Sequence, residues 1–376
     1  MYDFEESGSV RTPALVIYPE LVDGNIRATL GLLGGDAGRW RPHVKTSKLV
    51  YTMRRLVAHG VRQVKCATPL ELLTACEAGV DDAVLAYGVA DVHAARVIEI
   101  ARQFPQVRVS TIVEHPSQLA SWRGSPVGVF IDIDVGMHRT GIDVANVPGI
   151  VALARAIVES GVEFRGLHGY DGHAGSLPAA TAEASIHRGY DKLIAAAAVV
   201  RTAGLEVGEV ITAGTPAFPM TLSYRGFQAA GLTHRVSPGT VVYCDATAIP
   251  ELPASAGYRP AALVLTTVVS RPHPGRVTCD AGHKTVSADA GVPTCGVVGR
   301  DDLKPAKPSE EHLPIEVPET SRAPELGERL FLVPRHVCPT VNNFDHALIV
   351  EHGHLVGVER VTARGREAPW GGDSNQ

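Results

Sequence analysis

Short runs of β-branched residues alternate with helix-like segments over the first 216 residues, and this alternation limits the fold more than any other feature. The candidate strands are residues 14–18, 41–45, 64–68, 83–87, 107–113, 127–135, 164–170 and 209–214. Helical patterns lie between them, and several end at a glycine such as Gly79 or Gly204. Eight strands that alternate with helices predict a parallel (β/α)8 TIM-type barrel. A doubly wound open sheet is the alternative, but it usually has fewer strands, and no G-x-G-x-x-G follows the first strand.

The pattern changes after about residue 235. Short β-rich runs are separated there by clusters of Gly, Pro and Asp, without a long helical pattern, at 240–246, 261–270, 276–280, 329–333, 346–351 and 354–361. Such spacing is typical of an antiparallel β domain. We therefore predict a barrel over residues 10–235 and a β domain over residues 236–376, with residues 1–9 associated with the β domain.

Composition excludes several classes of partner. The 376 residues carry 35 Lys and Arg against 40 Asp and Glu, a net charge of −5, and only 5% are aromatic. This balance argues against a nucleic acid or an anionic membrane as partner. The sequence contains no apolar run of membrane-spanning length, begins without a secretory signal pattern and has only six cysteines. We expect a cytoplasmic protein that acts on a small molecule.

The ends of the predicted strands gather polar side chains that suit one cofactor. In a β/α barrel the catalytic groups collect where the strands end. The second strand ends in R-P-H-V-K, the sixth in D-V-G-M-H-R, the seventh in G-Y-D-G-H and the eighth in T-A-G-T-P. An amine, titratable rings and a small-residue turn that can cradle a phosphate are what pyridoxal 5'-phosphate requires. The cofactor-binding candidates are Lys45, His43, Arg139, Tyr170, Thr212, Gly214 and Thr215, and the catalytic candidates are Lys45, His173 and Asp171.

A second cluster lies in the predicted β domain, in the segment V-P-R-H-V-C-P-T. His336 and Cys338 are two residues apart, so both side chains would point the same way on an extended strand that Pro339 ends. Imidazole and thiolate on one face form half of a zinc site. The alternative is a hydrogen-bonded histidine beside a small buried cysteine.

The quoted motifs, together with D-A-G-H-K-T-V-S near residue 283, resemble the D-threonine aldolase and D-serine dehydratase-like family over nearly the whole chain. The resemblance implies an alanine-racemase-type barrel followed by a β domain, pyridoxal phosphate and a divalent metal. By this resemblance Lys45 carries the cofactor, Arg139, Tyr170 and residues 212–215 surround it, and His336 with Cys338 binds the metal. Zinc is the expected ion, with manganese and magnesium as alternatives, and the family implies a homodimer.

Three residues depart from the aldolase pattern of this family. Cys338 stands where aldolases carry a carboxylate, Asp171 where they carry a histidine, and Ser47 where the family often has another histidine. The resemblance implies a lyase for D-3-hydroxy amino acids. We favour retro-aldol cleavage to glycine and an aldehyde. The alternative is dehydration of the D-serine or D-3-hydroxyaspartate type, which Cys338 favours.

Other functions stay open at the level of sequence. An amino acid racemase would need a second base, for which Tyr243 and Tyr258 are candidates. A non-catalytic cofactor carrier would lack the β domain, and a metal-only hydrolase would use the histidines without Lys45. Absorbance of the purified protein with added pyridoxal phosphate separates the last of these from the others.

Overall fold

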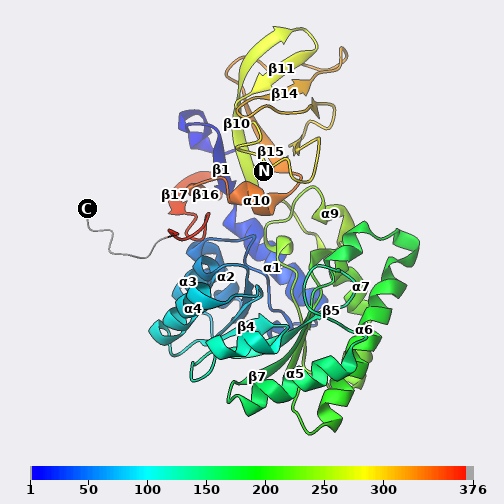
Figure 1. Cartoon of the computed structure of the whole chain (residues 1–376). Helices are drawn as coiled ribbons and strands as arrows, with labels where there is room; N and C mark the ends of the chain where they lie inside the picture. Colours follow the sequence, from blue (N-terminus) through cyan, green and yellow to red (C-terminus); the bar gives the residue numbers. More distant parts are fainter. Residues whose placement is uncertain (1, 370–376) are drawn as a thin grey trace. The chain divides into compact units, whose positions relative to one another are not determined.

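The computed structural model describes residues 2–369, and these form two compact units, each assembled from separate segments. Of the described residues, the barrel unit takes 36–45, 60–238 and 365–369, and the β unit takes 2–35, 46–59 and 239–364. In Figure 1 a strand from the early part of the chain (blue) lies beside strands from its late part (red) within the β unit. The predicted boundary at 235 falls close to Pro238, but residues 10–35 and 46–59 do not belong to the barrel.

A curled parallel sheet forms the barrel unit, as the alternating pattern predicts. Its strand order is β2-β3-β4-β5-β7-β8-β9, with the short β6 beside β5. The strands are β2 (Gln63–Cys66), β3 (Asp82–Leu85), β4 (Arg108–Val113), β5 (Gly128–Asp134), β6 (Ile142–Asp143), β7 (Phe164–Gly169), β8 (Glu209–Thr212) and β9 (His234–Val236).

Residues 40–44 bridge the two edges of this sheet. The Arg41 N–H donates to the Val236 carbonyl of β9, and the Val44 N–H donates to the Lys65 carbonyl of β2, both at 2.8 Å. Isolated parallel bridges join Trp40 to Val236 and His43 to Lys65. The segment therefore closes the barrel as its first member in chain order, and the predicted barrel architecture is confirmed.

Helices follow the strands of the barrel and cover its outside (Figure 1). They are α3 (Pro69–Ala78), α4 (Asp91–Gln103), α5 (Val147–Glu159), α6 (Ala179–Thr202), α7 (Phe218–Ser223) and α8 (Gly226–Ala229). Helix α3 illustrates how the sequence sets these bounds. The Thr68 side chain accepts from the Glu71 N–H at the start, Pro69 is the first helical residue, and Gly79 ends the helix with φ of 87°.

The barrel interior changes character along the strands. Near the strand starts, buried Arg41 forms ion pairs with Asp82 and Glu209, which are the first residues of β3 and β8. Two residues further along, Val84 and Ile211 pack together with other apolar side chains. Residues two apart on a strand point to the same side, so these four side chains all point into the barrel. We call the cluster of Arg41, Asp82 and Glu209 the charged floor of the barrel.

The β unit has an antiparallel sheet with one parallel neighbour pair. Its order is β13-β14-β11-β10-β1-β16-β17, and β15 joins β10 to β12. The strands are β1 (Ala14–Ile17), β10 (Ala262–His273), β11 (Arg276–Cys279), β12 (Cys295–Val297), β13 (Lys304–Pro305), β14 (Leu313–Glu316), β15 (Arg329–Pro334), β16 (His346–Glu351) and β17 (His354–Arg360). The helices are α1 (Pro19–Leu32), α2 (Val50–Ala58), α9 (Ala248–Glu251) and α10 (Val337–Val341).

Two strand predictions are wrong, the first in the sheet to which a real strand was assigned and the second in the type of structure. Residues 14–18 do not start the barrel, because β1 pairs antiparallel with β10 and parallel with β16. A short apolar strand that is buried on both faces has the same sequence pattern in either kind of sheet, so the pattern could not separate them. Residues 240–246 contain a 3-10 helix over Thr240–Val242 instead of a strand. The eighth barrel strand is β9, which lies at the predicted domain boundary.

Within residues 2–369, none of the helices combines the length and the apolar content that crossing a bilayer needs.

Candidate active site

Lys45 directly follows residues 40–44, the segment that closes the barrel, at the end where the parallel strands finish. Its side chain is half-buried and lines a cavity of about 540 Å³ together with His43, Asp132 and Arg139. The Lys45 N–H donates to His43 Nδ1 at 3.4 Å, which ties the two predicted cofactor residues together. The structure therefore places this amine in a cavity, at the end of the barrel where the sequence predicts it.

Arg139 and Tyr170 lie on neighbouring strand ends of the same unit. The Arg139 guanidinium stands 4.7 Å from the centroid of the Tyr170 ring, within cation–π distance. Arg139 follows β5, Tyr170 follows β7, and these two strands are paired in the sheet. The structure thus brings together two further members of the predicted set.

Asp171 holds the turn that follows β8. The N–H groups of Ala213 and Gly214 donate to its two carboxylate oxygens at 2.9 and 2.8 Å, and the Tyr190 hydroxyl donates at 2.5 Å. Asp171 is fully buried. Both oxygens are used in fixing the turn, and the acid–base role of Asp171 stays a prediction that these contacts do not support. Asp171 is an anchor of residues 212–215.

The same contacts revise the predicted phosphate cradle. The Gly214 N–H points to Asp171 instead of to a ligand, and the Thr212 hydroxyl pairs with His234 Nε2 at 2.8 Å. Thr215 begins a 3-10 helix over Thr215–Ala217. Thr212 and Gly214 therefore shape the turn from inside, and Thr215 stays the predicted phosphate contact.

Asp171→Asn is expected to lower the free energy of unfolding by about 1–3 kcal/mol, because the amide NH₂ faces a backbone N–H and leaves it unsatisfied. We also expect weaker binding of pyridoxal phosphate, since the turn loses its anchor. Chemical denaturation and an absorbance titration with the cofactor measure the two effects. Asp191→Asn is a matched control, because exposed Asp191 accepts from the Tyr224 hydroxyl in the same way. Equal stability of the two variants would contradict the anchor role.

His173 lies in the 3-10 helix Gly172–Ser176 that follows β7. Its Nδ1 is buried and has no hydrogen-bond partner among the described residues, and its ring packs against Gly136, where a Cβ would come within 3.1 Å of Nε2. A partly buried imidazole with an unused nitrogen can take or give a proton. His173 stays the predicted acid–base residue.

Ser237 is a residue that the sequence reading missed. It follows β9 directly, and its N–H donates to the carbonyls of Thr212 and Ala213 at 2.9 Å. Its hydroxyl is buried without a hydrogen-bond partner in the described chain. An unpaired buried hydroxyl beside this turn is what a polar ligand group would satisfy. The residues at this end of the barrel therefore fit pyridoxal phosphate.

Three buried residues inside the barrel were also missed. Lys65 of β2 places its amine 3.3 Å from His168 Nε2, and His168 Nδ1 lies 2.7 Å from Asp132 Oδ1. Burial lowers the pKa of Lys65 to about 7, helped by the charge of Lys45 and opposed by Asp171 and Asp132. Each residue sits within a predicted strand, and a charged residue inside an apolar run was the signal available. We call Lys65, His168 and Asp132 the buried relay.

His336 and Cys338 come together in the β unit, but not on a strand. His336 is the residue before α10 and Cys338 is the second residue of that helix, so the predicted extended geometry is wrong. The Asp245 carboxylate accepts from the Val337 N–H at 3.0 Å and from the Ala248 N–H at 2.7 Å, which fixes the start of α10. The two side chains still meet, because they are hydrogen-bonded to each other.

The contacts of this pair suit a metal. His336 Nδ1 lies 2.6 Å from Asp289 Oδ2, and the Cys338 sulfur lies 3.0 Å from the Thr46 hydroxyl. Burial alone would lower the pKa of His336, but Cys338 and Asp289 outweigh it and raise the pKa to about 9. A carboxylate on one ring nitrogen orients the ring so that the other nitrogen can bind an ion, the usual arrangement around zinc-bound histidine. One imidazole and one thiolate leave open positions, as in catalytic zinc sites.

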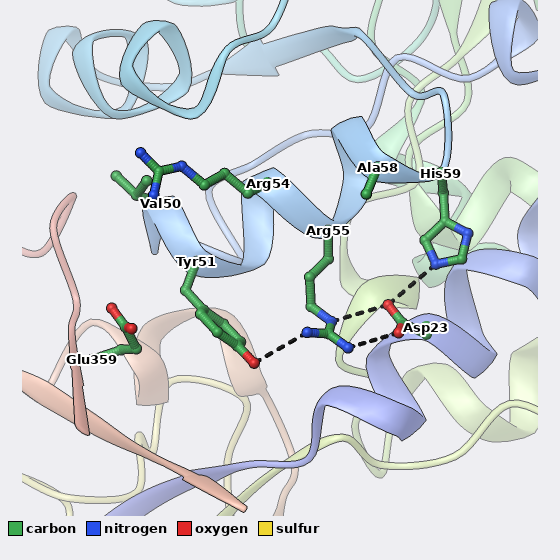
Figure 2. A pocket seen from close by; sticks show the side chains of 8 residues that line it. All are labelled: Asp23, Val50, Tyr51, Arg54, Arg55, Ala58, His59 and Glu359. Atoms are coloured by element: carbon green, nitrogen blue, oxygen red, sulfur yellow. Dashed lines mark hydrogen bonds and ion pairs between the residues drawn. The ribbon is translucent and has the colours of Figure 1, made fainter. Parts of the chain in front are cut away.

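A second cavity, of about 410 Å³, lies in the β unit between α1, α2 and β17 (Figure 2). Four of its polar groups are paired with one another. Arg55 forms two hydrogen bonds to Asp23 at 3.0 and 2.7 Å, and it also donates to the Tyr51 hydroxyl at 3.1 Å. His59 joins the same carboxylate at 3.2 Å. These contacts tie α1 to α2, so we interpret the cluster as structural.

Two family models match the chain over the elements just described. The model "Alanine racemase, N-terminal domain" matches residues 20–247, and the model "Putative serine dehydratase domain" matches residues 261–350. The chain therefore belongs to the alanine racemase N-terminal domain family, that is, to the fold-type III pyridoxal-phosphate enzymes.

Individual relatives narrow this class. The chain is 28% identical to a D-threonine aldolase of Arthrobacter sp., covering 95% of this chain and 93% of the relative. It is 26% identical to a D-threo-3-hydroxyaspartate dehydratase of Delftia sp., covering 89% and 92%. Among solved structures, a D-threonine aldolase from Filomicrobium marinum superposes with a TM-score of 0.85 at 27% identity, covering 96% of this chain and 97% of that one.

Proposed function

We propose that the protein is a pyridoxal-phosphate- and divalent-metal-dependent lyase that acts on D-3-hydroxy amino acids. The single observation that carries this proposal is the position of the Lys45 amine in a cavity at the strand ends of an alanine-racemase-type barrel. The relatives support it, because they cleave or dehydrate hydroxy amino acids of the D series by name.

The residues of the barrel have distinct tasks in this proposal. When bound, pyridoxal phosphate supplies an electron sink for negative charge at the substrate's Cα. Lys45 would hold the cofactor and carry a proton at Nζ, while Arg139 and Tyr170 would orient the ring. Thr215 and the turn anchored by Asp171 would hold the phosphate, and Ser237 would satisfy a further polar atom. His173 is the proposed proton carrier at the substrate's hydroxyl.

The divalent ion would be held by His336 and Cys338, with Asp289 orienting the imidazole. An ion on a hydroxyl oxygen lowers the pKa of that hydroxyl or neutralises departing hydroxide. We propose zinc because nitrogen and sulfur donors suit it, with manganese and magnesium as the alternatives.

Two reactions fit these groups. Retro-aldol cleavage to glycine and an aldehyde is the first candidate, since an aldolase relative covers nearly the whole chain. Dehydration is the second, and the Cys338 thiol favours it because a carboxylate occupies this position in aldolases of the family. The racemase alternative is weakened. The Tyr243 hydroxyl is buried against Thr52 at 2.7 Å, and the Tyr258 hydroxyl contacts Thr29 at 2.9 Å, so both proposed bases are engaged.

Product analysis separates the two reactions. The protein loaded with cofactor and zinc is incubated with D-threonine, D-serine and D-3-hydroxyaspartate, with the L-isomers as controls. Cleavage releases glycine with an aldehyde, and dehydration of D-serine releases pyruvate with ammonia. We expect turnover of at least one D-isomer and none of its L-isomer. No turnover of any D-substrate would contradict the proposal.

Cys338→Ala and His336→Ala are expected to lower turnover by at least about 10²-fold, because each removes a metal ligand. The yellow absorbance of the cofactor should persist, since the barrel residues are unchanged. Chelation of the wild type should reproduce the loss, and added zinc should reverse it only where both ligands remain. Cys279→Ala, in the apolar core of the same unit, is the control. Full activity after exhaustive chelation would rule out the metal.

The homodimer stays a prediction from the family resemblance, and the cytoplasmic location stays a prediction from the sequence. Sedimentation of the cofactor-loaded protein tests the first.

A further inference from the structure

The amine of Lys65 lies inside the barrel. Its residue is 2% exposed, in the third position of β2. A lysine amine is rarely buried without a partner, because the loss of hydration is costly. Its partner here is an imidazole nitrogen, not a carboxylate, so the amine is not held in one charge state by an ion pair.

The buried relay defines how the protons are arranged around Lys65. The short contact between His168 Nδ1 and Asp132 indicates that Nδ1 carries the hydrogen and donates to the carboxylate. His168 Nε2 then accepts from the Lys65 amine at 3.3 Å. Burial lowers the pKa of His168, and the charge of Lys65 adds to this effect, so the ring stays neutral near pH 7.

Lys65 is also next to the residues that the proposed function places in the active site. The Val44 N–H, one residue before Lys45, donates to the Lys65 carbonyl. The Lys65 amine stands 5.7 Å from the centroid of the Tyr170 ring, the ring that Arg139 covers. Asp132, at the other end of the relay, lines the cavity that holds Lys45.

We propose that Lys65 is a positioning residue of the active site, whose amine, held by His168, sets the electrostatic field around Lys45. This inference rests on the proposed function, because it assumes that Lys45 carries the cofactor. The charged groups that face the amine are Asp171 and Asp132, which favour its protonated form, and Lys45 and Arg41, which oppose it. With burial these hold the pKa of Lys65 to about 7, so the field changes near neutral pH.

The test compares three proteins, which sample two charge states of position 65, each loaded with pyridoxal phosphate. Lys65→Met is always neutral, Lys65→Arg is always positive, and the wild type can change between the two. The readout is the absorbance spectrum of the bound cofactor between about pH 6 and about pH 9, without substrate. We expect a wild-type transition near neutral pH that both variants lack. The wild type should resemble Lys65→Arg below the midpoint and Lys65→Met above it.

The outcomes are distinguishable. A transition that persists unchanged in Lys65→Met overturns the role of Lys65 and leaves the proposed function intact. A wild-type protein that acquires no cofactor absorbance overturns both proposals. If the variants do not fold, ¹⁵N-lysine NMR of the wild type decides instead. One amine signal that titrates between about pH 6 and about pH 8 supports the proposal, and its absence overturns it.

Discussion

Replacing Lys45 by alanine should abolish the yellow absorbance of the cofactor-loaded protein and lower turnover by more than about 10³-fold. The physical reason is that Lys45 is the amine that lines the barrel cavity, beside His43 and Arg139. Removal of that amine takes away both the covalent attachment point and a proton carrier. Absorbance spectra and steady-state kinetics measure the two losses.

Lys45→Arg separates charge from chemistry in this prediction. A guanidinium keeps the positive charge but stays protonated and cannot serve as the nucleophile. It should therefore be as inactive as Lys45→Ala. Lys192→Ala, on the exposed side of α6, is the control and should keep full absorbance. Borohydride treatment of the wild type followed by peptide mapping should place the reduced cofactor on Lys45. An adduct on another lysine would contradict the proposed function.

Arg41→Met should lower the free energy of unfolding by about 3–5 kcal/mol, the largest stability effect that we expect in this chain. Arg41 is fully buried and binds Glu209 with two hydrogen bonds, at 2.8 and 3.0 Å, and Asp82 with one, at 2.8 Å. The substitution removes a positive charge and leaves the buried carboxylates of Asp82 and Glu209 with fewer ion-pair partners. Urea denaturation measures the change. Arg62→Met, which breaks an exposed pair with Asp81, should cost less than about 1 kcal/mol.

The same cluster should make the free energy of unfolding decrease at acidic pH. Burial alone would raise the pKa of Asp82, but Arg41 and Arg165 outweigh it and lower the pKa to about 2. A carboxyl group with a depressed folded-state pKa contributes stability above its unfolded pKa of about 4 and loses it as the pH falls toward about 2. We expect this group to contribute about 2.5 kcal/mol, which is lost progressively between about pH 5 and about pH 1. Asp82→Asn should flatten the acid limb of the stability profile.

Local sequence pattern predicted the barrel because a parallel strand and its helix are adjacent in the chain. Thr68 and Gly79 define the ends of α3, and similar signals recur through residue 204. Strand β1 was misassigned because its pairing partners are at the far end of the chain. A pattern of apolar residues reports burial, but it does not report which sheet causes the burial.

The site was predictable where one segment carries the chemistry and not where distant segments share it. Lys45 and Arg139 follow strand ends, so position along the barrel located them. The buried relay takes one residue from each of β2, β5 and β7, and only the closed barrel brings these together. Asp171 was predicted to be catalytic because a carboxylate at a strand end usually faces the ligand. In the structure its two oxygens accept hydrogen bonds from two backbone N–H groups instead.

Strand β1 has a consequence for how the chain is made. It lies between β10 and β16, so during synthesis it leaves the ribosome long before either neighbour exists. The segment from Gly60 to Pro238 can pair with itself as it emerges, whereas β1 must wait with both hydrogen-bonding edges unprotected. A nascent chain halted before Ala262 should therefore expose this apolar strand to chaperones, and release of the complete polypeptide should hide it.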